Sequence, residues 1–242
     1  MHHAESHEQK SDSSLRRPGR KQIIYEGFRR NSVGWFLGAL ILFIITMPLV
    51  RHLPSGDVIE SLFLTAVLLS AVMAVGGRRR TLVAATCLVT PAVAAKWVDH
   101  LRPELVPQPL IMITALAFIA FVIAHHLHFV LRAPRVNSEV LCAGIATYLM
   151  LAMFWAFAFL LASALNPASF LFSGNGPTNK AMDGFEAIYF SLGALSGVTF
   201  GDITPVTDAV RMLATLEAVV GTFYLAILIA RLVSLYSTEA DR

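Results

Sequence analysis

One stretch near the end of the chain combines residues that expose backbone to a small charged species. It reads SGVTFGDITPVT, from Ser196 to Thr207, and contains two glycines, an aspartate and a proline between a short apolar segment and a long one. Backbone carbonyl oxygens of a glycine-containing segment are able to replace the water shell of a dehydrated cation. These residue types therefore indicate a segment whose main-chain oxygens contact a cation.

The residues before this stretch are expected to form a short helix that positions it. The segment GFEAIYFSLGAL, residues 184–195, is apolar, but a run of about twelve residues is too short to cross a hydrocarbon layer of about 30 Å. Non-helical backbone at membrane depth is tolerated only where protein or a watery cavity surrounds it. We therefore expect a re-entrant helix whose carbonyl end, with about half a negative charge, faces a cation path.

The composition of the whole chain predicts an all-α membrane protein. Of the 242 residues, 56% are hydrophobic and 14% are charged, whereas soluble domains carry about a quarter charged residues. Six apolar segments are long enough to cross a membrane as helices. They lie at 33–50, 58–76, 81–98, 110–131, 138–164 and 207–235.

The basic residues indicate the orientation of these segments in the membrane. Seven of the nineteen Lys and Arg residues lie before Asn31. With the N-terminus in the cytoplasm, the inner side collects fourteen basic residues and the outer side five, so the positive-inside rule places both termini in the cytoplasm. We read this distribution as membrane topology and expect lipid, not nucleic acid, around the chain.

On these elements, the run from Ala187 to Tyr236 resembles the pore helix, selectivity filter and inner helix of bacterial potassium channels. The filter pattern of that family, T-T-x-G-Y-G-D, aligns without gaps on Ser196, Gly197, Val198, Thr199, Phe200, Gly201 and Asp202. The resemblance implies a homotetramer in the bacterial inner membrane and a permeant monovalent cation, potassium or sodium, with no other cofactor or metal.

The same resemblance divides the chain into three parts. Residues 1–32 form a basic cytoplasmic segment, residues 33–136 a four-helix peripheral bundle, and residues 137–242 the pore domain, in which the re-entrant helix lies between the fifth and sixth spans.

Three residues depart from the family pattern. Thr199 occupies the position of the first filter glycine, which takes a positive φ in the family, and a β-branched residue with positive φ is strained by about 1 to 3 kcal/mol. Gly197 replaces the threonine whose hydroxyl completes the innermost ion site. Phe200 lacks the tyrosine hydroxyl that braces the filter. We therefore expect a filter of a different shape, with weak selectivity.

Three residues outside the filter are candidates for supporting or opening the pore. Gly221 matches a hinge glycine of the family, while close helix packing is an equal reading. Glu217 lies within a span, where an ionisable group is costly unless it is paired, so we expect it to bond to the re-entrant segment or to a neighbouring subunit. Tyr189 belongs to the aromatic pair of the re-entrant helix and is a candidate for pore support.

The segment 110–131 carries no arginine at every third position through its core, so it offers no source of steep voltage dependence. Its histidines, His125, His126 and His128, are candidates for a proton sensor, for interfacial anchoring or for packing. Metal binding is a weaker reading, because no cysteine or carboxylate lies nearby at ligand spacing.

Other classes of function compete with an ion channel. A non-conducting or regulatory homologue has the same pattern. A secondary transporter favours broken helices in both halves, and only the C-terminal half is interrupted here. An intramembrane hydrolase requires a histidine after Ser196 to activate the serine, but no histidine follows His128. We therefore do not expect an enzyme.

Overall fold

The computed structural model gives an all-α protein with a single pair of short strands in the part of the chain that it describes. That part consists of residues 32–51, 53–54, 56–75, 79–102, 107–133, 137–173 and 180–240. The predicted basic segment at 1–32 lies outside it except for Ser32, which begins the first helix.

Six helices are long and apolar enough to cross a membrane, and each coincides with one of the six predicted segments. They are α2 (Ser32–Val50), α3 (Gly56–Ala74), α4 (Arg79–Leu101), α5 (Gln108–Arg132), α6 (Ser138–Leu165) and α8 (Asp208–Ala240). The prediction of an all-α membrane protein is confirmed.

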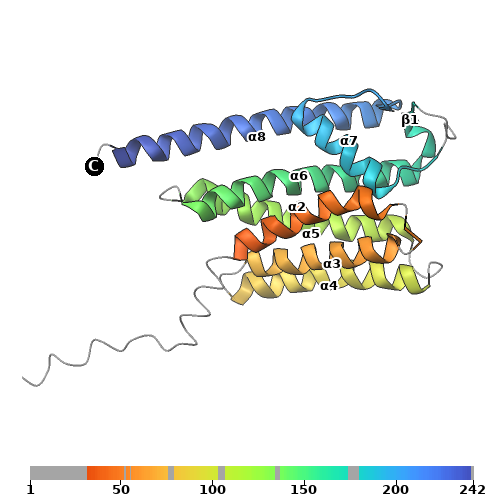
Figure 1. Cartoon of the computed structure of the whole chain (residues 1–242), viewed down its shortest axis with the longest axis horizontal. Helices are drawn as coiled ribbons and strands as arrows, with labels where there is room; N and C mark the ends of the chain where they lie inside the picture. Colours follow the sequence, from red (N-terminus) through yellow and green to blue (C-terminus); the bar gives the residue numbers. More distant parts are fainter. Residues whose placement is uncertain are drawn as a thin grey trace, which may run out of the picture.

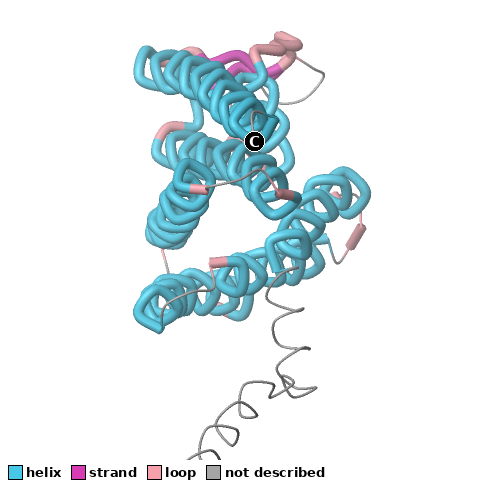
Figure 2. Tube along the Cα trace, turned by 90° about the vertical axis from the view of Figure 1, so that its left-hand side faces the viewer, coloured by secondary structure: helices cyan, strands magenta, loops and turns pink. Residues whose placement is uncertain are grey.

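Helix α6 lies between two groups of helices (Figure 1). The antiparallel neighbours α2, α3, α4 and α5 lie on one side of it, and α7 (Gly184–Ser196) and α8 lie on the other. Figure 2 looks along the helices and shows the strand pair beside this second group. Because α6 packs on both sides, 39% of its spanning window is buried, against 11% for α8. Most of the surface of α8 is therefore left without a partner in a single chain.

The connection between α6 and α8 turns back into the molecule. Strand β1 (Phe170–Phe172) follows α6 through η1 (Pro167–Ser169), and β2 (Ile203–Pro205), which follows α7, pairs with it antiparallel. Helix α7 has 13 residues, which corresponds to about 20 Å, less than the hydrocarbon thickness of about 30 Å. This is the re-entrant arrangement that the sequence predicts.

Gly221 allows α8 to approach the end of α7 closely. A Cβ atom on this residue would lie 2.1 Å from the carbonyl oxygen of Leu195, whereas a Cβ atom on Gly38 of α2 would meet nothing within 4 Å. The contact at Gly221 is the one that close helix packing requires, and α8 continues as a helix through this residue. The hinge role stays a prediction.

The replacement Gly221→Ala is expected to destabilise the protein by about 1 to 3 kcal/mol, because the methyl group would force the two helices apart. The matched variant Gly38→Ala, also in a helix, is expected to be neutral or more stable by up to about 1 kcal/mol. Thermal unfolding of the purified variants in detergent measures both effects. Equal unfolding of the two would contradict the close contact.

Candidate functional site

Helix α7 begins and ends with local signals in its own sequence. Asp183 caps its first turn, and the side chain of Glu186 closes a capping box with it. At the other end Gly197 has a φ of 74°, the left-handed conformation that commonly ends a helix. The Val198 N–H donates to the Gly193 carbonyl at 2.8 Å. A Cβ atom on Gly193 would lie 2.6 Å from the Val198 carbonyl oxygen, so a glycine is needed for this turn.

The seven residues aligned with the family filter fall into two groups. Ser196 is the last residue of α7, and its hydroxyl donates back to the Leu192 carbonyl at 2.7 Å. Gly197 caps the helix. The remaining residues, Val198–Asp202, form an irregular and exposed segment that leads into β2. We call Val198–Asp202 the filter segment.

The backbone of the filter segment avoids the strain considered above for Thr199. Among the described residues only Gly197 and Gly201 have a positive φ, at 74° and 79°. Thr199 therefore has a negative φ, which a β-branched residue adopts without cost. The backbone of the filter segment therefore differs from that of the family filter, in which the residue at the position of Thr199 has a positive φ.

Tyr189 packs against the filter segment. Its ring stacks on Phe200, with centroids 5.5 Å apart and planes inclined by 17°, and its hydroxyl faces the Asp202 carboxylate. Both contacts join one turn of α7 to the filter segment. The tyrosine hydroxyl that Phe200 lacks is thus present on the residue against which Phe200 stacks.

The filter segment also has a defined connection to the strand pair. The Ser173 N–H donates to the Asp202 carbonyl at 2.7 Å, and the Val206 N–H donates to the Ser169 carbonyl at 2.9 Å. The Asp202 side chain accepts from the N–H of Ile203 at 3.1 Å. The C-terminal end of the filter segment is therefore fixed to the segment that precedes α7.

A buried polar contact joins the middle of α7 to α6 and α8. The Ser191 hydroxyl donates to the Ala152 carbonyl of α6 at 2.7 Å, and it also lies within hydrogen-bond distance of the Glu217 carboxyl of α8. Glu217 and Ser191 are both 0% exposed. Of the two partners expected for Glu217, the re-entrant segment is the one that it contacts in this chain.

The number of protons available for these hydrogen bonds indicates the protonation state of Glu217. A hydroxyl carries one proton. When Ser191 gives that proton to the Ala152 carbonyl, its contact with Glu217 requires a proton from the carboxyl. The other carboxyl oxygen, Oε2, has no hydrogen-bond partner among the described residues, and an unpaired buried charge is very costly. The arrangement therefore fits a neutral acid at Glu217.

The histidines lie apart from the filter segment. His126 is buried in α5, where its Nδ1 donates to the Val122 carbonyl at 3.0 Å and its ring packs on Phe36 at 5.4 Å. Helix α5 packs mainly on α4 and α6. Within the described ranges, no group of three His, Cys, Asp or Glu side chains could hold a metal ion. For His126, the contacts are those of a packed core residue.

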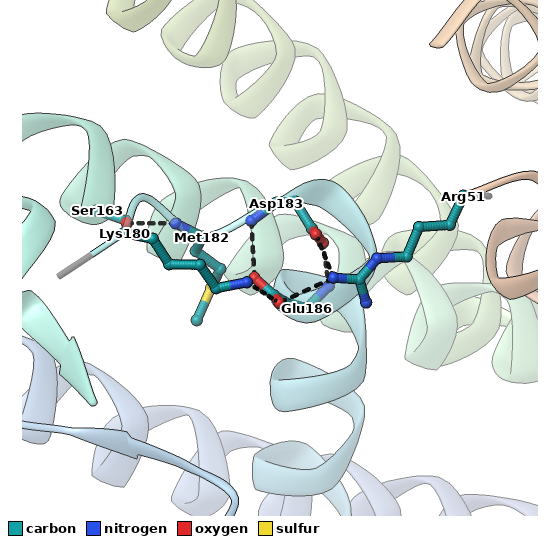
Figure 3. A network of polar contacts seen from close by, with 6 residues as sticks. All are labelled: Arg51, Ser163, Lys180, Met182, Asp183 and Glu186. Carbon is teal, nitrogen blue, oxygen red and sulfur yellow. Dashed lines mark hydrogen bonds and ion pairs between the residues drawn. The ribbon is translucent and has the colours of Figure 1, made fainter. Parts of the chain in front are cut away.

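Sequence reasoning missed the polar cluster at the start of α7 (Figure 3). Asp183 and Glu186 form the D-x-x-E pattern of a capping box, so a local signal for them existed. The third member, Arg51, lies 135 positions before Glu186. Nothing in its neighbourhood in the sequence marks it.

The C-terminal part of the chain matches a known family. Residues 145–238 match the family described as Ion channel. The matched segment begins in α6 and includes α7, the filter segment and nearly all of α8. No curated protein and no solved structure matches the chain. Residues 145–238 are therefore similar to the ion channel family, which confirms the resemblance at that level.

The neutral form of Glu217 predicts different outcomes for two substitutions. Glu217→Gln is expected to retain the stability of the wild type, because the amide donates to Ser191 as the neutral acid does. Glu217→Ala is expected to lose about 2 to 4 kcal/mol from a lost hydrogen bond and a cavity. Thermal unfolding in detergent compares them. If the glutamine variant were as unstable as the alanine variant, an ionised carboxylate would be required instead.

Proposed function

We propose that the protein is a tetrameric, potassium-channel-like cation channel that conducts passively through the filter segment. The observation that carries this proposal is the exposed segment Val198–Asp202 directly beyond the carbonyl end of α7, within the residues that match an ion channel family. The carbonyl end of a helix favours cations, and bare carbonyl oxygens are suitable ligands for them. No bond of a substrate needs to be made or broken.

The exposed surface of α8 supports an assembly of several copies. One filter segment cannot enclose an ion path, so the proposal requires copies around an axis. Five large apolar residues recur at helical spacing along α8 and are exposed: Met212, Leu216, Val219, Phe223 and Ile227. In the proposed homotetramer this face lies beside neighbouring copies, continuous with the exposed filter segments. By resemblance, four copies complete the ring.

The proposed orientation follows from the charge distribution. The protein is a multi-pass protein of the bacterial inner membrane with both termini in the cytoplasm, so the strand pair and the N-terminal end of α7 lie on the outer side. Residues 33–136 form the peripheral bundle and residues 137–242 the pore domain. Gly221 is a candidate hinge for the inner end of the pore.

The proposed selectivity among monovalent cations is weak. Gly197 ends the helix and supplies no hydroxyl, and Thr199 stands where the family has a glycine. Potassium is the permeant ion that the resemblance favours, and sodium is the second. A non-conducting homologue would have the same span pattern, and a secondary transporter is the other alternative, so a direct measurement of conduction separates these functions.

Purified protein in liposomes is expected to pass cations down a potassium or sodium gradient, without a coupled substrate. Ion flux and single-channel recording measure this. Discrete current steps would distinguish a channel from a transporter, whose turnover gives no such steps. The absence of cation flux at every tested pH, voltage and lipid composition would refute the proposed function.

The double replacement of Thr199 by Gly and Phe200 by Tyr is expected to raise the potassium-to-sodium permeability ratio by about tenfold, the equivalent of about 1.4 kcal/mol. Glycine permits the positive φ of the family filter, and the tyrosine hydroxyl restores its brace. Reversal potentials under mixed gradients measure the ratio. Phe129→Tyr, which adds the same hydroxyl on exposed Phe129 of α5, is the control. An unchanged ratio would mean that the filter segment does not govern conduction.

A further inference from the structure

A network of four charged side chains holds the N-terminal end of α7 (Figure 3). The Arg51 Nη2 atom lies 2.8 Å from Asp183 Oδ2 and 3.1 Å from Glu186 Oε1. Lys180 forms a further ion pair with Glu186 Oε1. The ring of Phe185 lies 5.2 Å below the guanidinium carbon of Arg51. Two cations and two carboxylates thus meet at the first turn of the helix.

In each carboxylate of this network, one oxygen accepts a backbone N–H of the capping box and the other accepts from a cation. Asp183 Oδ1 accepts the Glu186 N–H at 2.8 Å and Glu186 Oε2 accepts the Asp183 N–H at 3.2 Å, which together form the capping box. The remaining oxygens accept from cations, Asp183 Oδ2 from Arg51, and Glu186 Oε1 from Arg51 and Lys180. The interactions that start the helix and those that fix its position are therefore made by the same two side chains.

Glu186 is the buried member of this network. Its side chain is 10% exposed. Burial alone would raise the pKa of Glu186, but the hydrogen bonds from Lys180, Asp183 and Arg51 and the charge of Lys180 outweigh it and lower the pKa below 4.5. Arg51 and Asp183 are more exposed, at 36% and 42%. The network therefore consists of one buried carboxylate held by partly exposed partners.

Arg51 comes from a different part of the chain than the other three residues of the network. Asp183 and Glu186 belong to the cap and first turn of α7, and Lys180 lies three residues before Asp183. Arg51 directly follows Val50, the last residue of α2, in the group of helices on the far side of α6 (Figure 1). Its guanidinium is thus an attachment of α7 to the peripheral helices.

We propose that Arg51 is a positioning residue for the filter segment, through which the peripheral helices hold α7 in its conducting orientation. Helix α7 is a single rigid rod of 13 residues between this attachment and Gly197. Rotation of its N-terminal end moves its C-terminal end, and with it the stacking of Tyr189 on Phe200. The proposal rests on the proposed channel function and assigns to Arg51 a role in it.

Two substitutions and one control test the role of Arg51. Arg51→Gln removes the charge, and Arg51→Lys retains it. The control is Arg102→Gln. Arg102 follows α4 at the same end of the bundle as Arg51, is exposed, and makes no side-chain hydrogen bond or ion pair within the part of the chain that the structure describes. All variants are made in the full chain.

The first measurement is hydrogen exchange at the amides of Glu186 and Ala187, which does not depend on conduction. Both amides donate to Asp183. In Arg51→Gln their exchange is expected to increase about fivefold, with at least half of this change reversed in Arg51→Lys and none present in Arg102→Gln. Unchanged exchange in Arg51→Gln, or an equal change in Arg102→Gln, overturns the proposal.

The second measurement is single-channel recording in liposomes. The fraction of time spent conducting is expected to fall about fivefold in Arg51→Gln, to recover by at least half in Arg51→Lys and to stay at the wild-type value in Arg102→Gln. Increased exchange without a change in conduction overturns the proposal, because α7 would then be held without consequence for the pore. A silent wild type refutes the channel function itself, and the exchange experiment then decides whether Arg51 holds α7.

Discussion

The structure depends on one constraint, that backbone polar groups at membrane depth need partners. Helices α2–α6 and α8 meet it within themselves, but the connection between α6 and α8 enters the molecule and leaves it without forming a complete span. Its partners are the cap at Gly197, the bond from Val198 to the Gly193 carbonyl, and the pairing of β1 with β2. These contacts hold the two ends of the filter segment, whose residues are exposed in a single chain.

The position of the filter segment depends on the position of α7, because the segment directly follows this helix. Three contacts along the length of α7 fix it to different helices: Arg51 at the first turn, the Ser191 hydroxyl with α6 and α8 in the middle, and the approach of Gly221 to Leu195 at the end. An ion pair, a buried polar contact and a glycine contact respond differently to substitution. Their contributions to the placement of the filter segment are therefore separable.

The predictable parts of this fold are those set by local sequence. Length and apolarity identify the six spans, and the twelve-residue segment before Ser196 is too short to be a seventh. The role of Gly197 was harder to predict. An alignment without gaps makes Gly197 a filter residue, whereas a glycine directly after a helix is equally typical of a helix cap.

Contacts between distant segments were the unpredictable part. Arg51 is one basic residue at the end of one apolar span, and only the packing of α2 near α7 makes it a partner of Asp183 and Glu186. The contact of Glu217 with Ser191 was expected as one of two choices, because an ionisable group in a span needs a partner. The sequence predicts that Glu217 has a polar partner, but it does not identify the helix that provides this partner.

The spacing of the two positive-φ glycines bears on what the proposed channel selects. In the family pattern the first filter glycine, which takes a positive φ, is at the position of Thr199. Here the two positive-φ glycines are Gly197 and Gly201, and Gly197 ends α7. The residues between them all have negative φ, so this segment does not reproduce the positive φ that the resemblance places at Thr199. In the proposed channel this difference in shape is the reason to expect weak selectivity, because discrimination between cations requires that carbonyl oxygens replace the water of the ion.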